Sequence, residues 1–136
     1  MWVKWKLHEM EIRTLKKIFH NQNGRILFAY LFGSRARGTY SNNSDMDIAV
    51  YLKPQHSMQF FDIKTQLYLE ISRALKTNDI DIVVLNQSKN IMLMDSIIRN
   101  GKVLYESDQD ARLDFEQQIL HTAIDFQTQR KRIMGV

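Results

Sequence analysis

The chain has 136 residues, of which 44% are hydrophobic and 25% are charged, a composition typical of a globular domain. This length predicts a single domain, residues 1–136, that buries a substantial core. A net charge of +4 and a pI near 9.4 suit an anionic partner such as a nucleotide, a nucleic acid or an acidic protein face. No apolar run reaches the roughly 18 residues needed to span a bilayer. There is also no signal-peptide core and no cysteine, so we expect a cytoplasmic protein without a membrane partner.

Apolar periodicity predicts helices and strands in alternation along the first part of the chain. Residues 8–20 have the spacing of an amphipathic helix, and the continuous apolar run 25–32 indicates a central strand. A second strand is expected at 45–52, and a second helix at about 58–75. A third strand, rich in β-branched residues, is expected at 78–86. The buried stripe of the second helix has four members: Phe60, Ile63, Leu67 and Ile71.

The remaining chain predicts a short helix at 91–100, a short edge strand at 102–106 and one long helix from about 108 to 133. Ser107 and Asp110 have the spacing of a capping box for the long helix. One face of this helix shares four apolar residues: Phe115, Ile119, Ala123 and Phe126. The order of elements predicts an α/β (α+β) fold, with a small mixed sheet flanked by helices.

Three aspartates lie near the starts of two predicted strands. Asp45 and Asp47 are two residues apart, so their side chains leave the same face, while Met46 between them points into the core. Asp81 has the same character near the start of another buried strand. If these strands are close in the sheet, three carboxylates converge at one edge, where they repel one another unless a cation is bound. Two Mg²⁺ ions held by such carboxylates form a clamp for nucleotidyl displacement.

A Gly-Ser turn precedes these aspartates and supplies features that suit phosphate. Gly33 has no Cβ, so the backbone can turn sharply, and Ser34 offers a hydroxyl beside N–H groups that can form an anion-binding nest. Arg35 and Arg37 can neutralise phosphate oxygens, and Ser44 either contacts phosphate or caps the turn. The linker between the two strands, about a dozen residues, has a length that is often functional.

Together, Gly33-Ser34, ten intervening residues and Asp45-x-Asp47 resemble the G-S-x10-D-x-D signature of the polymerase-beta-type nucleotidyltransferase superfamily. The stretches "LFGSRARG" and "SDMDIAV" look like its small stand-alone branch, the minimal nucleotidyltransferases. The resemblance covers about residues 25–105 and implies the polymerase-beta-like fold for that core. In this family a third acidic residue lies on a later strand, where Asp81 matches and Asp79 is the competing candidate.

The resemblance implies that AMP is transferred from ATP to a hydroxyl. Asp45, Asp47 and Asp81 would bind two Mg²⁺ ions and act in catalysis. The nucleotide would be bound by five residues of the Gly-Ser segment: Gly33, Ser34, Arg35, Arg37 and Ser44.

The resemblance also implies a partner. Minimal nucleotidyltransferases pair with small helical HEPN toxins, so we expect an antitoxin that adenylylates a tyrosine of its toxin and has no direct contact with DNA. Two alternatives stay open. One is a free-standing enzyme that adenylylates a small molecule such as an aminoglycoside, and the other is a non-catalytic antitoxin that only occludes its toxin.

Overall fold

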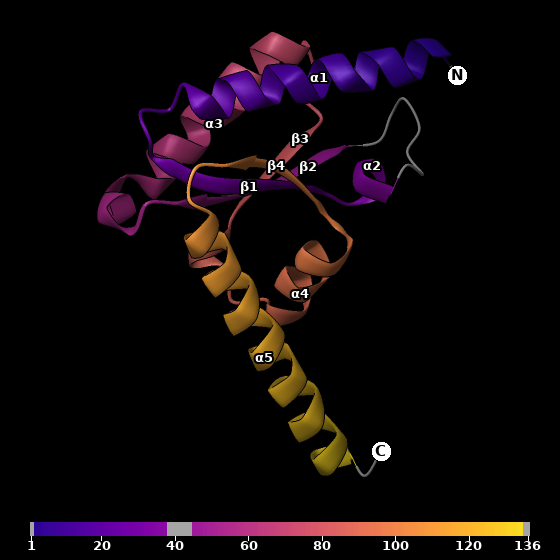
Figure 1. Ribbon diagram of the computed structural model, residues 1–136, viewed down its shortest axis with the longest axis vertical. Coiled ribbons are helices and arrows are strands. Elements are labelled where there is room, and N and C mark those ends of the chain that lie inside the picture. The colour runs from indigo at the N-terminus through magenta and orange to yellow at the C-terminus, as the bar shows by residue number, and fades with distance from the viewer. Residues whose placement is uncertain (1, 38–44, 135–136) are drawn as a thin grey trace.

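The computed structural model describes residues 2–37 and 45–134, with side chains from residue 9 onward except that of Arg37. Its centre is a four-stranded mixed sheet in the order β3-β2-β1-β4, which lies between two layers of helices (Figure 1). On one face lie α1 (Trp2–His20) and α3 (Phe60–Leu75), and on the other lie α4 (Ile91–Asn100) and α5 (Gln109–Met134). The predicted α/β sheet domain is confirmed.

The central strand of the sheet is β1 (Ile26–Phe32), the continuous apolar run of the sequence. It pairs antiparallel with β2 (Met46–Leu52) on one side and with β4 (Lys102–Glu106) on the other. The remaining strand, β3 (Ile80–Val84), pairs with β2 in parallel. A parallel pair needs a long crossover connection, and α3 provides it. Every predicted strand is present within two residues of its expected bounds, and β4 is at an edge, as predicted.

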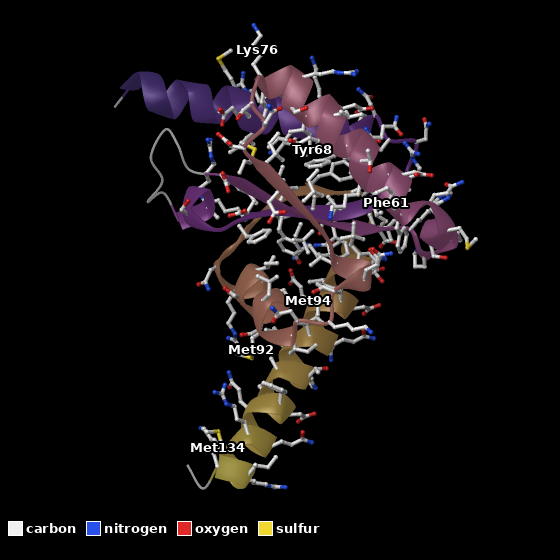
Figure 2. All side chains as sticks on the ribbon, turned by 180° about the vertical axis from the view of Figure 1, so that it is seen from behind. Phe61, Tyr68, Lys76, Met92, Met94 and Met134 are labelled. Carbon is white, nitrogen blue, oxygen red and sulfur yellow. The ribbon has the colours of Figure 1, made fainter. Side chains whose placement is uncertain are left out.

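Side chains alternate along the strands between two apolar clusters, one on each face of the sheet. Met46 and its alternate neighbours on β2 pack toward α1 and α3, where the predicted stripe of α3 is buried. On the other face Phe28, Tyr30 and Ala49 pack with residues of α4 and α5. Figure 2 shows Met94 between α4 and the sheet, where its side chain is buried. Even-numbered residues of β2 therefore face the layer of α1 and α3, and odd-numbered residues lie on the side of the sheet that α4 and α5 cover.

Three short helical turns were not predicted from the sequence, and two of them replace the end of a predicted strand or the start of a predicted helix. They are α2 (Ser34–Arg37), η1 (Pro54–Gln59) and η2 (Leu85–Gln87). The residues before Phe60 form the 3-10 turn η1, so α3 begins at Phe60 rather than at about residue 58 as predicted. At the N-terminus α1 begins at Trp2, six residues earlier than predicted. These differences lie at element ends, where local preference is weakest.

The N-terminus of α5 is capped in a way that the sequence did not predict. Asp108 accepts a hydrogen bond from the backbone N–H of Ala111 at 3.0 Å, which satisfies one orphan donor of the first turn. The hydroxyl of Ser107 instead donates to the carbonyl of Ile26 at 3.0 Å. The predicted capping box of Ser107 and Asp110 is wrong, because Ser107 is used to join the loop to β1.

Only the first part of α5 packs against the sheet. Phe115 is buried and Ile119 partly so, both against the apolar cluster beneath β1. Phe126, predicted on the same face, is 46% exposed, and the helix projects away from the sheet (Figure 1). The predicted apolar face therefore continues beyond the part of α5 that packs against the sheet. None of the helices in the described ranges is both long and apolar enough to cross a bilayer.

A polar network fixes the packed part of α5 to two strands. Arg112 donates to Glu116 at 3.0 Å and also forms an ion pair with Glu106 of β4. Glu116 in turn accepts a hydrogen bond from the hydroxyl of Tyr30 on β1. Burial, and then the hydrogen bond to Glu116, raise the pKa of Tyr30 well above its ordinary value, so it stays a neutral donor.

Candidate active site

The first residues of β2 and β3 lie side by side at one end of the sheet. In the parallel register Asp47 is directly opposite Asp81, so the two carboxylates leave the same face of adjacent strands. The N–H of Met46 donates to the carbonyl of Asp79 at 2.8 Å, which extends the pairing to the residue before β3. Asp79 therefore lies outside the strand and contacts β2 through its backbone. The register favours Asp81 over Asp79 as the third acidic residue.

Asp45 lies immediately before β2 and is exposed to solvent. The pKa of Asp47 is raised above its ordinary value, mainly by burial and then by the charges of Asp81 and Asp45. Each of these contributions raises the pKa of Asp47 and none lowers it. The charges of Asp45 and Asp81 therefore act on Asp47 at this end of the sheet.

Gly33 connects β1 to α2 directly beside Asp47. Its φ angle is +74°, a left-handed conformation that costs glycine little and other residues more. A Cβ at this position would lie 2.2 Å from Oδ2 of Asp47. The same glycine is thus required by the backbone turn and by the carboxylate packed against it. The Gly-Ser turn and the aspartate pair form one continuous site.

The polar residues of the turn differ in their surroundings. Ser34 is the first residue of α2 and is partly exposed. Arg35 donates to Oε2 of Glu11 on α1 at 2.9 Å, and only 13% of its side chain is exposed. The side chain of Arg37, the last residue of α2, and the whole of Ser44 lie outside the described residues.

Glu11 is a residue of this region that sequence reasoning missed. It lies 24 positions before Arg35 on a different helix, so no motif or spacing links the two. Only the packing of α1 beside α2 brings them together. The ion pair fixes Arg35 next to the Gly-Ser turn and neutralises part of its charge.

The donor chemistry of this end of the sheet fits Mg²⁺. A hard cation prefers carboxylate oxygens, and a cation relieves the repulsion that raises the pKa of Asp47. Within residues 2–37 and 45–134, no three acidic, His or Cys side chains are grouped closely enough to hold a metal by themselves. Mg²⁺ is usually bound by one or two carboxylates, with waters and substrate phosphates as its other ligands. The adjacent Asp47 and Asp81 meet that requirement.

Comparison with known proteins decides the family. The family model described as polymerase beta, nucleotidyltransferase matches residues 13–110. The chain belongs to this nucleotidyltransferase family. The match includes all the candidate residues of the turn and of both strands, so the family predicted from the Gly-Ser and Asp-x-Asp spacing is confirmed.

Two relatives and one solved structure place the nucleotidyltransferase in a particular branch. The protein adenylyltransferase MntA of Aphanizomenon flos-aquae is 32% identical over 122 residues, which cover 85% of this chain and 77% of the relative. MntA of Shewanella oneidensis is 28% identical over 109 residues, covering 79% and 73%. A crystal structure of a toxin–antitoxin with AMP-PNP contains a chain that is 26% identical, with a TM-score of 0.70 and coverage of 91% and 95%. The nucleotidyltransferase is thus of the minimal, MntA type, as the sequence predicted.

The second solved structure shows the fold alone. It contains the tri-AMPylated HEPN toxin of Shewanella oneidensis in complex with its MNT antitoxin. The matched chain is 22% identical to this nucleotidyltransferase, with a TM-score of 0.67 and coverage of 94% and 96%. The polymerase-beta-like fold therefore extends over nearly the whole chain, including the long C-terminal helix.

Proposed function

We propose that this nucleotidyltransferase moves AMP from ATP to a tyrosine hydroxyl of a HEPN toxin, and so acts as the antitoxin of a toxin–antitoxin pair. The observation that carries the proposal is the pairing of Asp47 with Asp81 directly beside Gly33. The MntA relatives are named protein adenylyltransferases, and AMP-PNP, an ATP analogue, is present in a structurally similar toxin–antitoxin complex. Because ATP is the donor, we place the reaction in the cytoplasm.

The turn at Gly33 binds the triphosphate of ATP in this proposal. Backbone N–H groups of the turn donate hydrogen bonds to the β- and γ-phosphates, and the hydroxyl of Ser34 donates another. Arg35 stabilises the negative charge of the phosphates from the position in which Glu11 holds it. Arg37 and Ser44, on the same segment, complete the predicted nucleotide contacts.

The three aspartates act on the reacting atoms. Asp45 and Asp47 would hold two Mg²⁺ ions and Asp81 one of them, which when bound neutralise phosphate charge and lower the pKa of the attacking hydroxyl. Asp81 accepts the proton of that hydroxyl as its oxygen forms a bond to the α-phosphorus. The bond from the α-phosphorus to the bridging oxygen breaks, and pyrophosphate leaves in line.

Intact-mass spectrometry of the toxin tests the proposal. The toxin is incubated with this nucleotidyltransferase, ATP and Mg²⁺, and its mass should increase by one or more AMP units. Asp45→Asn and Asp47→Asn should each abolish the increase while the fold survives, and Asp125→Asn on the exposed part of α5 provides a charge-matched control. A toxin without added AMP after incubation with the wild-type protein would refute adenylylation. Full transfer by both aspartate variants would refute the site.

Two further assays separate the two alternatives. A small-molecule adenylyltransferase would transfer AMP to an aminoglycoside in the absence of any toxin. An antitoxin that acts by occlusion would still neutralise the toxin when it carries both Asp45→Asn and Asp47→Asn. We expect neither result, since a module that only binds has no need for paired carboxylates beside a Gly-Ser turn.

A further inference from the structure

A second concave site lies at the opposite edge of the sheet from β3. It is a cavity of about 710 Å³ between α1 and the edge strand β4, well within the size range of ligand sites. Its wall on α1 carries four basic residues, namely Arg13, Lys16, Lys17 and His20. Its floor on β4 includes Leu104 and Tyr105. We call this cavity the α1–β4 groove.

The basic residues of the α1–β4 groove form a straight row. Positions 13, 16, 17 and 20 are related by i, i+3, i+4 and i+7, so they share one face of α1 and span about 10 Å along its axis. All four side chains are exposed. Within the described residues, none of the four forms an ion pair. Like charges at these spacings destabilise a helix, so helix stability does not explain the row.

The acidic residue of the groove offsets only part of the row. Glu106 also lines the cavity, but its carboxylate shares Arg112 of α5 with Glu116, so these three residues leave one negative charge against the three permanent positive charges of the row. The floor is rigid: Leu104 is buried, and the ring of Tyr105 packs against Phe19 with 6.1 Å between ring centroids. A ligand in the groove therefore meets the three positive charges of Arg13, Lys16 and Lys17 above a floor that includes an aromatic ring.

We infer that the α1–β4 groove binds single-stranded RNA, with backbone phosphates along the row on α1 and a base against Tyr105. A basic groove with an aromatic floor is the combination by which proteins hold single strands. A nucleic-acid backbone carries a charge at every unit, so it can meet each cation of a continuous row. An acidic peptide would need carboxylates at matched positions and would gain nothing from the ring. The groove is separate from the Gly-Ser turn, so RNA binding needs neither ATP nor Mg²⁺.

Fluorescence anisotropy with a labelled ten-nucleotide uridine RNA tests the inference. The full chain is titrated in EDTA, without ATP, over a series of salt concentrations. Three permanently charged contacts predict a slope of log K against log salt of about −2 for a single strand. Lys16→Gln/Lys17→Gln should weaken binding about tenfold at low salt and reduce the slope to about −0.7. Lys64→Gln/Lys89→Gln removes the same charge from exposed positions elsewhere and should leave binding unchanged.

A second variant tests the floor of the groove. Tyr105→Leu should weaken RNA binding by about fivefold or more, because a stacked base is lost, while the salt slope stays the same. Thermal unfolding of each variant shows that the fold is retained. Since Lys16 and Lys17 are outside the proposed active site, AMP transfer by their double variant should equal that of the wild type.

Three results would overturn the inference. They are equal loss of RNA binding in both lysine double variants, wild-type affinity in Tyr105→Leu, and displacement of the RNA by an equal length of oligoglutamate. The last result would assign the groove to an acidic protein segment. RNA binding is measured in EDTA without ATP, whereas AMP transfer is measured with Mg²⁺ and ATP. Failure of RNA binding is therefore distinguishable from failure of the proposed function.

Discussion

Two groups of acidic residues in this nucleotidyltransferase have opposite electrostatic surroundings. At the start of β2 and β3, Asp47 is close to Asp81 and Asp45, and its pKa is raised by burial and by those charges. Beneath β1 and β4, Glu106 and Glu116 are both paired with Arg112. The pKa of that guanidinium is raised, above all by its hydrogen bond to Glu106. One group thus has its counter-ion within the chain, whereas among residues 2–37 and 45–134 the charges that act on Asp47 are those of Asp81 and Asp45.

The difference separates a structural role from a functional one. Paired acids tie α5 to the sheet and are satisfied without any ligand. Neighbouring acids without a cation repel one another and reduce the stability of the folded chain. A protein retains such a cluster where a bound cation offsets the repulsion.

The largest effect is expected from Gly33→Ala. The new Cβ would lie 2.2 Å from Oδ2 of Asp47 at a φ of +74°, so either the turn or the carboxylate must move. A displacement of this size at a catalytic centre should reduce AMP transfer about 100-fold. Transfer is measured by single-turnover assay. Gly24→Ala, also at positive φ but with nothing within 4 Å of its Cβ, controls for backbone strain and should retain transfer. Equal loss of transfer in both variants would contradict the contact with Asp47.

Arg112→Ala should have the next largest effect, on stability. It leaves Glu106 and Glu116 without their cation at a half-buried site and weakens the attachment of α5, which costs about 2 kcal/mol of unfolding free energy. Urea unfolding measures the loss, and Arg73→Ala on the exposed face of α3 serves as the control. AMP transfer per folded molecule should be unchanged. A loss of transfer with no loss of stability would mean that this network serves the active site.

Asp47→Asn should stabilise the chain when no divalent cation is present. The folded pKa of Asp47 is raised, so the native state binds more protons than the unfolded state between the two pKa values, and stability falls as pH rises through that window. The amide avoids this cost, so Asp47→Asn should be more stable than the wild type at pH 7. The gain should shrink as pH falls toward the unfolded value of about 3.9.

Thermal melts in EDTA at several pH values measure that gain, with Asp125→Asn as the charge-matched control. A destabilised Asp47→Asn at pH 7 would show that the carboxylate is held by contacts other than those that raise its pKa. Addition of Mg²⁺ and AMP-PNP should then stabilise the wild type and not the variant, since only the carboxylate binds the cation.

The smallest effect is expected from Glu11→Gln. Loss of the ion pair lets Arg35 move away from the Gly-Ser turn, which should raise the KM for ATP about threefold and leave kcat nearly unchanged. Glu9→Gln, an exposed acid on the same helix, removes the same charge without the contact. Steady-state kinetics distinguishes the two variants. A fall in kcat at constant KM would assign Arg35 to the reacting phosphate rather than to binding.

Much of this protein is determined by the sequence alone. The strands and the long helices follow from apolar periodicity, because burial of an apolar face outweighs most other local preferences. The Gly-Ser and Asp-x-Asp spacing predicted the family through its resemblance to the G-S-x10-D-x-D signature, and the shared face of Asp45 and Asp47 follows from their spacing on a strand. The alternation along β2, with Met46 in the core and Asp47 outside it, follows from the alternation of apolar and acidic residues in the sequence.

Tertiary structure decided the rest. The register of β2 against β3 selected Asp81 rather than Asp79 as the partner of Asp47, because strand pairing depends on a crossover that local sequence does not encode. Packing of α1 beside α2 brought Glu11 to Arg35, and packing of α1 beside β4 created the basic groove. Asp108 caps α5 in place of Ser107, because the hydroxyl of Ser107 donates a hydrogen bond to the carbonyl of Ile26 on β1. Contacts between residues far apart in the chain arise only when the sheet and its helices assemble, so no local pattern predicts them.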